Sequence, residues 1–295
     1  MTDLYLYQTV HVAHGRALHV ARHAALLDAA ARTWFGFGYP VRKPLPRSGI
    51  LPGRGRARSE GFEATTTFGA EISIAPSGPA EATADGSDQR AGTPRDPVEA
   101  LRRRIEALAR AEHYPTTGSG FVRIELLPEG EERLVATGIS LYNGYGYRSL
   151  QPSAVTIRYD IPFSEAPTSL HEAASLMARQ AARRAKAEAA IRYDEKGMFR
   201  EVEGAPIFAI AGRTVLAPPD TEPVERVERM ITRRAVEAAG LEFREEAFGR
   251  SDLKHLDELF FTDHRGITSL SHCDGLPLMI YTAERIAAKL PLTDE

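Results

Sequence analysis

The chain of 295 residues lacks the features that mark several large classes of protein. Its only cysteine is Cys273, so no disulfide framework can form and a cytoplasmic location is expected. No apolar run approaches the ~20 residues of a membrane span. Residues 1–7 have no basic region before an apolar stretch, so a signal peptide is not expected there.

The chain also lacks a large excess of charge of one sign, because its formal net charge is only -3. A protein that binds nucleic acid through a strong basic field is therefore not expected. The charged fraction of 26% and the hydrophobic fraction of 43% are those of a globular protein with a buried core. Composition thus predicts a soluble protein without nucleic-acid or membrane partners.

The patterns that are present predict an α/β (α+β) chain with two lobes. We place the N-terminal lobe at residues 1–145 and the C-terminal lobe at residues 146–295. Strand patterns occur at residues 120–127, 133–142 and 154–160. We expect these three strands to extend one mixed sheet.

Local signals define the start of the N-terminal lobe. Residues 4–12 are typical of a strand, and Gly15 is suited to the hairpin turn that follows. Residues 20–33 are rich in alanine, the best helix former. Asp96 followed by Pro97 is typical of a helix start.

Residues 40–97 form an insertion rich in proline and glycine, which disfavour helices and interrupt strands. Within it, residues 62–74 could form a short hairpin and residues 80–95 a surface loop. The basic segment from Arg54 to Arg58 could contact phosphate or nucleic acid. We interpret it as a solvated loop.

The C-terminal lobe alternates short strands with three predicted helices, at residues 169–186, 227–239 and 282–290. The first of these helices is amphipathic, with an apolar face that we expect to lie inside. That face consists of Leu170, Ala173, Ala174, Met177, Ala181 and Ala185.

A series of short motifs follows a constant order along the chain. They are the hairpin at residues 7–16, His23, the segment 168–170 with the helix after it, residues 197–201, 216–219, 231–233, 256–260 and 266–268. Their order and spacing resemble the class IV (fold type IV) pyridoxal-phosphate (PLP) aminotransferases. That family includes branched-chain and D-amino-acid aminotransferases and aminodeoxychorismate lyase. The resemblance implies a fold like that of D-amino-acid aminotransferase, and a homodimer.

The resemblance also implies a catalytic site, and the chain departs from it. The family's lysine forms a Schiff base with PLP, and here that position is Thr168. The arginine that binds the cofactor phosphate corresponds to Leu26, and a glycine beside the phosphate corresponds to Met230. Neither a hydroxyl nor an alkyl chain can replace the lysine amine. We therefore expect no cofactor.

Some residues remain that the resemblance assigns to the cofactor cleft. Glu201 corresponds to the carboxylate that holds the pyridine nitrogen, although Glu203 competes for this role. The Ile231 and Thr232 amides correspond to a phosphate-binding helix start. With Arg233 and Arg265 they form a candidate anion site. The alternative is that Glu201 is simply a surface carboxylate at a strand turn.

Three functions are compatible with these residues. The first is a degenerate class IV aminotransferase homologue without transaminase activity, which binds a small anionic molecule or acts as a scaffold. The second is an active PLP enzyme whose lysine lies elsewhere. The third is a structural subunit that pairs with an active paralogue. Whether the chain is an enzyme stays open at this point.

Two further patterns have weaker interpretations. His19 and His23 are four residues apart and could share a metal ion on a helix, but no cysteine or carboxylate completes such a site, so none is expected. Residues 142–147 are rich in tyrosine and glycine. They could border a cleft between the lobes or form an ordinary turn.

Overall fold

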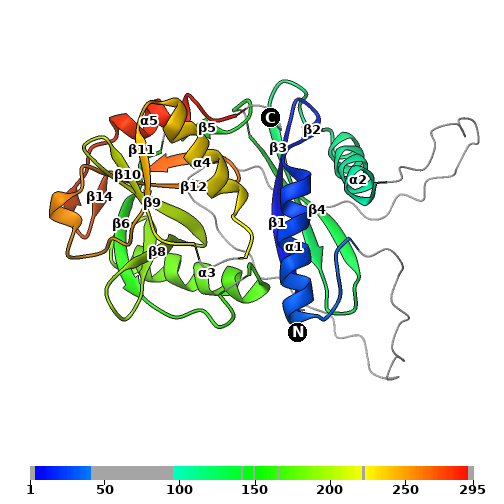
Figure 1. Cartoon of the computed structure of the whole chain (residues 1–295), viewed down its shortest axis with the longest axis horizontal. Helices are drawn as coiled ribbons and strands as arrows, with labels where there is room; N and C mark the ends of the chain where they lie inside the picture. Colours follow the sequence, from blue (N-terminus) through cyan, green and yellow to red (C-terminus); the bar gives the residue numbers. More distant parts are fainter. Residues whose placement is uncertain are drawn as a thin grey trace, which may run out of the picture.

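The structure, a computed structural model, describes residues 4–40, 96–140, 142–148, 150–164, 166–220 and 223–291. These residues form two lobes that lie side by side (Figure 1). Most of the 40–97 insertion, with the hairpin, surface loop and basic segment predicted in it, lies outside the described residues. No helix in the described ranges is long and apolar enough to cross a membrane.

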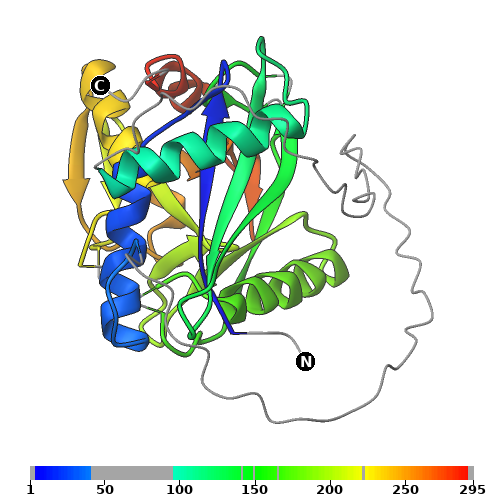
Figure 2. The ribbon, with the colours of Figure 1, turned by 90° about the vertical axis from the view of Figure 1, so that its right-hand side faces the viewer.

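The N-terminal lobe is built on a four-stranded antiparallel sheet with the order β2-β1-β3-β4. Its strands are β1 (Leu6–Ala13), β2 (Arg16–Ala17), β3 (Ser119–Leu126) and β4 (Glu132–Ser140). Helices α1 (Val20–Trp34) and α2 (Pro97–Ala111) pack on this sheet and on each other. Figure 2 shows α2 crossing in front of the strands.

The predicted local signals of this lobe are confirmed. The turn between β1 and β2 has His14 and Gly15 at φ 51° and 73°, a backbone conformation that glycine adopts without strain. The Asp96 carboxylate accepts the Val98 amide at 2.9 Å and caps α2. Leu101 and Ile105 of α2 are fully buried in the core of the lobe.

The C-terminal lobe is built on a mixed sheet with the order β15-β14-β6-β7-β8-β9-β12-β13-β5, and β10 and β11 extend it from β9. Its strands are β5 (Gly146–Tyr147), β6 (Ser153–Arg158), β7 (Ala189–Tyr193), β8 (Phe199–Val202), β9 (Ala205–Ala211), β10 (Thr214–Ala217), β11 (Glu242–Glu245), β12 (Glu258–Asp263), β13 (Gly266–Ser269), β14 (His272–Cys273) and β15 (Leu276–Pro277). Its helices are α3 (Ser169–Arg184), α4 (Val227–Ala238) and α5 (Tyr281–Ala287), with a 3-10 turn at Leu253–His255.

The sheet of this lobe separates apolar clusters. On one side, Phe208 and Phe260 stack with ring centroids 5.1 Å apart and pack with residues of α4 and α5. On the other, Phe199 and Phe248 meet edge to face at 5.9 Å. Each fully buried side chain of this size contributes about 1.5–3 kcal/mol to stability.

The expectation of one mixed sheet for the three strands was wrong. β3 and β4 belong to the antiparallel sheet of the N-terminal lobe, whereas β6 pairs in parallel with β7 in the other lobe. The chain passes between the lobes through residues 142–145, where Gly144 has φ 75°. Strands on either side of this crossing therefore join different sheets.

The predicted inner face of α3 was also wrong. The buried residues of α3 are His171, Ala178 and Ala182, whereas Leu170 and Met177 are 42% and 73% exposed. The small alanines let the helix approach β6 and β7 closely, against a cluster that includes Ala187 and Ala190. The larger side chains consequently point to solvent.

Candidate functional site

The two lobes are joined by two clusters of polar side chains. The first is the Thr168 cluster, defined as Tyr5, Tyr7, Arg123, Thr168, His171 and Glu172. The connection before α3 binds the start of β1, because the Tyr7 amide donates to the Pro167 carbonyl at 3.1 Å. The Ser169 amide donates to the Tyr5 carbonyl at 3.0 Å. This pairing places Thr168 between the lobes.

Thr168 itself is the N-cap of α3. Its hydroxyl oxygen accepts the Leu170 amide at 3.2 Å, and its own amide donates to His171 Nδ1 at 3.2 Å. Nδ1 must therefore be the unprotonated ring nitrogen, so the Thr168 hydroxyl, 3.0 Å away, donates to it as well. Both side chains are buried. Position 168, where the family resemblance implies the catalytic lysine, thus serves as the N-cap of α3.

Charged and phenolic groups complete the Thr168 cluster. Glu172 accepts hydrogen bonds from Tyr5 and from Arg123. The Arg123 guanidinium lies over the rings of Tyr5 and Tyr7, at 5.9 and 5.7 Å from their centroids. Burial, with the charge of Glu172, raises the pKa of Tyr7 to about 12. This phenol is therefore a neutral hydrogen-bonding group at physiological pH.

Glu201 lies on β8 and is 7% exposed. Its carboxylate accepts Arg192 Nε at 3.0 Å across the β7–β8 pair. Glu203, the competing candidate, lies in the turn after β8 at φ 51° and pairs with Arg179 of α3. The Tyr159 hydroxyl near this site is buried and has no hydrogen-bond partner among the described residues, and burial raises its pKa.

Ile231 and Thr232 lie inside α4, which begins at Val227, four residues before Ile231. Amides at these positions donate to carbonyls one turn earlier, so they are not free to bind an anion. The Thr232 hydroxyl donates to the Glu228 carbonyl at 2.7 Å and lies 2.8 Å from the Thr262 hydroxyl. Ile231 is fully buried in the core of the lobe.

Arg265 and Arg233 are each paired with carboxylates and share no partner among the described residues. Arg265 donates to Asp263 through Nε and Nη2, at 2.9 and 2.6 Å. Burial opposes the ionisation of Asp263, but Arg265 and His264 lower its pKa to about 2. Arg233 donates to Glu225 and lies 5.4 Å from the centroid of Phe243. A ligand bound by either arginine would therefore compete with its carboxylate.

The two positions implied to contact the cofactor phosphate are apolar and buried together. Leu26 and Met230 are 6% and 9% exposed and belong to one apolar cluster. Arg22, one turn before Leu26, lies with Nη2 3.5 Å from the Met230 sulfur and 3.9 Å from Glu225. This arginine is thus the nearest cation to the pair, and it already has an acidic neighbour.

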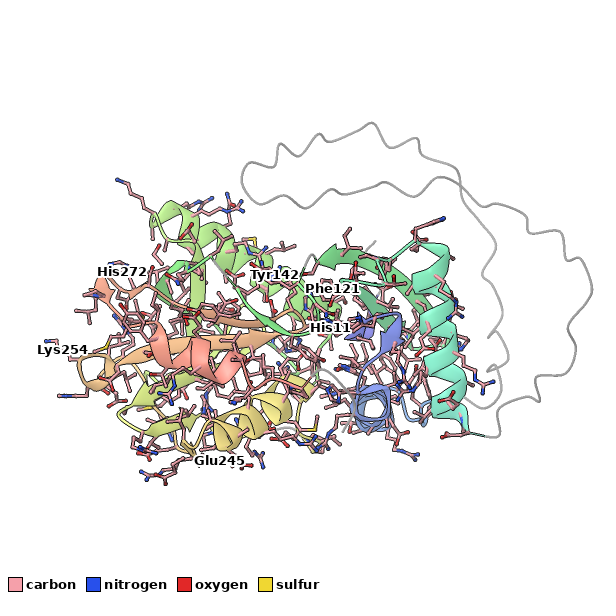
Figure 3. The ribbon with its side chains drawn as sticks, turned by 90° about the horizontal axis from the view of Figure 1, so that it is seen from above. His11, Phe121, Tyr142, Glu245, Lys254 and His272 are labelled. Atoms are coloured by element: carbon pink, nitrogen blue, oxygen red, sulfur yellow. The ribbon has the colours of Figure 1, made fainter. Side chains whose placement is uncertain are left out.

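Lys186, Lys196, Lys254 and Lys289 are all exposed. In Figure 3, Lys254 lies at the end of the molecule opposite the lobe junction. Lys43 lies outside the described residues.

The second cluster at the junction, the His11 cluster, consists of His11, Ser119, Gly144 and His264. His11 Nδ1 donates to the His264 carbonyl at 2.8 Å, so Nε2 is the unprotonated nitrogen. The Ser119 hydroxyl therefore donates to Nε2 at 2.7 Å, while its oxygen accepts the Gly144 amide at 2.8 Å. Burial lowers the pKa of His11 to about 4. This neutral network connects β1, β3, the lobe crossing and the β12–β13 turn.

The tyrosine-rich segment also borders this junction. Tyr145 is buried, with its ring centroid 4.4 Å from that of His11 and 6.0 Å from that of His19. His19 is the N-cap of α1 at φ 53°, and His23 contacts Gln8 at 2.9 Å. No group of three metal-ligating side chains gathers within the described ranges. Figure 3 shows His11, Phe121 and Tyr142 where the lobes meet.

These observations define a two-lobed α/β protein whose polar clusters lie where the lobes join. Residues 102–264 match the family model described as amino-transferase class IV, and they make up more than half of the chain. The chain therefore belongs to the class IV aminotransferase family. No curated protein matches its sequence.

Several solved structures share the fold of this chain. A hypothetical aminotransferase from Mycobacterium tuberculosis, bound to alpha-ketoglutarate and PMP, has a TM-score of 0.63 and 17% identity, covering 97% of this chain and 87% of its own. The branched-chain aminotransferase of Thermoproteus uzoniensis with norvaline has a TM-score of 0.65 and 15% identity, and the match covers 97% of this chain and 83% of that aminotransferase. A putative 4-amino-4-deoxychorismate lyase from Legionella pneumophila has a TM-score of 0.63 and 11% identity, and the match covers 96% of this chain and 88% of the lyase. The predicted fold is confirmed.

The expectation of no cofactor is contradicted by these comparisons. The Mycobacterium tuberculosis protein was also solved in a PLP-bound form, and an aminotransferase from Brucella abortus was solved bound to PLP. PLP is therefore the cofactor to which the fold points. Covalent attachment is a separate matter, and the residue at position 168 does not fit it, because Thr168 has no amine and its hydroxyl is committed to the cap of α3.

Proposed function

We propose that this chain is a class IV aminotransferase homologue that forms no Schiff base between a lysine and PLP, and therefore does not catalyse transamination. PLP chemistry of this kind needs a lysine amine to bind the cofactor and to move the substrate proton. The observation that carries the proposal is the capping box of Thr168 and His171, which occupies the expected lysine position.

Two further observations support it. The described lysines are exposed, and Lys254 lies far from the lobe junction. Glu201 is in an ion pair with Arg192, so its charge is already compensated. A pyridine nitrogen that approached Glu201 would compete with this guanidinium.

Absorption spectroscopy tests the proposal. The purified protein is mixed with PLP, and its spectrum is recorded before and after borohydride, together with a transaminase assay over a panel of amino acids. We expect the spectrum of free or non-covalently bound PLP and no turnover. A borohydride-sensitive Schiff-base band, or turnover above the background of PLP alone, contradicts the proposal.

An active enzyme with a lysine elsewhere is the second candidate, favoured by the PLP-bound structures of the same fold. Lys43 is the lysine to test, because it lies outside the described residues and the four described lysines are exposed. A band that disappears in Lys43→Ala and persists in Lys196→Ala, an exposed lysine in the β7–β8 turn, would establish this candidate.

A small anionic ligand at Arg233 and Arg265 stays a prediction. Such a ligand would have to displace Glu225 from one arginine or Asp263 from the other. Titration with inorganic phosphate checks it, with Arg265→Ala and the exposed Arg158→Ala as a matched pair. A loss of phosphate binding in the first variant alone would support the prediction.

The homodimer implied by the family also stays a prediction, as does pairing with an active paralogue. The exposed stripe of α3, defined by Leu170, Leu176 and Met177, offers a place to test both. Exposed apolar side chains that are grouped on one helix are typical of protein interfaces.

A further inference from the structure

A small apolar hollow opens beside the Thr168 cluster. It lies between the C-terminal half of α1 and two connecting segments of the C-terminal lobe, and its volume is about 30 Å³. The residues of its wall that matter here are Leu26, Ala29, Ala30, Trp34, Ala166 and Pro167. The α1 residues among them are spaced by three, four and eight positions, so they form one stripe of the helix.

The side chains of the wall are apolar except for the Thr33 hydroxyl and the Trp34 indole N–H. Thr33 carries the one side-chain hydroxyl of the wall, and it donates to the Ala29 carbonyl at 3.0 Å. The Pro167 carbonyl accepts the Tyr7 amide. A charged or polar group that entered would lose its hydration without compensation, whereas an apolar group would gain from leaving water.

Two exposed aromatic side chains adjoin the hollow. Trp34, which lines it, is 39% exposed, and Phe163 beside Trp34 is 54% exposed. Their rings meet edge to face with centroids 4.8 Å apart. Exposed large apolar side chains next to a concave apolar surface are typical of a binding site.

The volume limits what the hollow can enclose. About 10–15 Å³ of such space is needed for one water-sized group, so 30 Å³ holds two or three carbon atoms. A ligand would therefore insert the end of an aliphatic group and leave its remainder over the Trp34 indole.

The hollow also borders the altered cofactor positions. Leu26 stands where the family resemblance implies the phosphate arginine, and Pro167 directly precedes Thr168. An apolar residue at position 26 thus removes a charge from this part of the junction and supplies a wall of the hollow.

We propose that this hollow binds the aliphatic end of a small molecule, such as a short branched alkyl group, against Trp34. The proposal does not depend on the absence of a Schiff base. A lysine found to bind PLP would contradict the proposed function and leave the present test unchanged.

The fluorescence of Trp34 tests the proposal directly, because it is the only tryptophan of the chain. The full-length protein is titrated with 3-methylbutanol, and with glycerol as a polar control. We expect a saturable change in emission with 3-methylbutanol and none with glycerol. A response that rises linearly without saturation, or that glycerol reproduces, overturns the proposal.

Matched variants locate the binding. Ala30→Leu fills the hollow and should weaken 3-methylbutanol binding at least tenfold, whereas Ala25→Leu, exposed on the same helix, should leave it within twofold. Ala29→Leu is a second filling variant if Ala30→Leu fails to fold, as judged by circular dichroism. Unchanged affinity in a folded filling variant contradicts the proposal. So does Trp34 emission that shifts with protein concentration alone, because a second copy would then cover the hollow.

Discussion

The two clusters that join the lobes use different interactions. The His11 cluster is a neutral network in which each hydrogen of His11, Ser119 and Gly144 has a defined acceptor. The Thr168 cluster is held by charges, with Arg123 paired to Glu172 and Glu125. Partly exposed ion pairs contribute little to stability, whereas a buried neutral network is costly to break. The comparison indicates that the His11 cluster fixes the lobes and that the Thr168 cluster is the more tolerant of change.

The largest effect is expected for His11→Ala. The substitution leaves a cavity among Phe121 and Tyr145 and an unpaired Ser119 hydroxyl. We expect the free energy of unfolding to fall by about 3 kcal/mol, measured by urea denaturation. His272→Ala, at an exposed site far from the junction in Figure 3, should change it by less than about 0.5 kcal/mol. Equal effects of the two variants would contradict the role of His11.

The pH dependence of stability sharpens the same point. His11 takes a proton near pH 6.5 in the unfolded chain but only near pH 4 in the folded protein, so folding is favoured while the ring is neutral. This stability is complete above pH 6.5 and is lost as the pH falls toward 4. It amounts to about 3 kcal/mol. His11→Phe should remove this part of the pH profile. A profile identical to that of the original chain would rule out His11 as its source.

A smaller effect is expected for Arg123→Met in the Thr168 cluster. Glu172 and Glu125 lose their guanidinium, but the side chains are partly exposed, so we expect a loss of only about 1 kcal/mol. The double variant with Glu172→Gln should recover part of the loss, because one carboxylate is removed. Thermal unfolding of both variants measures this. A loss larger than that of His11→Ala would reverse the comparison.

Thr168→Ala tests the Thr168 hydroxyl, which caps α3 and also donates to His171 Nδ1. We expect a loss of about 1 kcal/mol, typical of an N-cap hydroxyl, and near-original stability for Thr168→Ser. Asp96→Ala at the start of α2 is a matched cap in the other lobe and should cost a similar amount. Stability that does not differ between Thr168→Ala and Thr168→Ser would show that the hydroxyl does not act as a cap.

The smallest effect on folding is expected for Met177→Glu, on the exposed stripe of α3. Because Met177 is 73% exposed, stability should change by no more than about 0.5 kcal/mol. If two copies pair through this stripe, the variant should be monomeric in sedimentation while the original chain is dimeric. Dimers that persist in Met177→Glu would place the interface elsewhere.

Much of the fold followed from local signals in the sequence. The Asp96–Pro97 helix start and the turn at Gly15 each depend on residues adjacent in the chain. The face of α3 did not follow, because alanines occur on both sides of this helix and periodicity alone cannot choose between them. The start of α4 at Val227 agrees with the helix predicted at residues 227–239, and it places Ile231 and Thr232 inside the helix instead of at its first turn.

The site was only partly predictable for a related reason. Thr168 and Glu201 could be named from motifs, and Thr168 lies at the junction of the lobes. Tyr7, Arg123 and His11 were missed, because their partners lie far along the chain and only the fold brings them together. The one available signal was an arginine within the largely apolar strand β3. Buried charges within a strand usually have a partner.

The central claim is that the residue at position 168 caps a helix and that no lysine replaces it as the attachment point of PLP. Peptide mass spectrometry after incubation with PLP and borohydride reduction tests this most directly, because reduction makes any Schiff base permanent. We predict that no lysine peptide gains the pyridoxyl mass above the level seen with denatured protein. Stoichiometric labelling of a single lysine, Lys43 included, would contradict the claim.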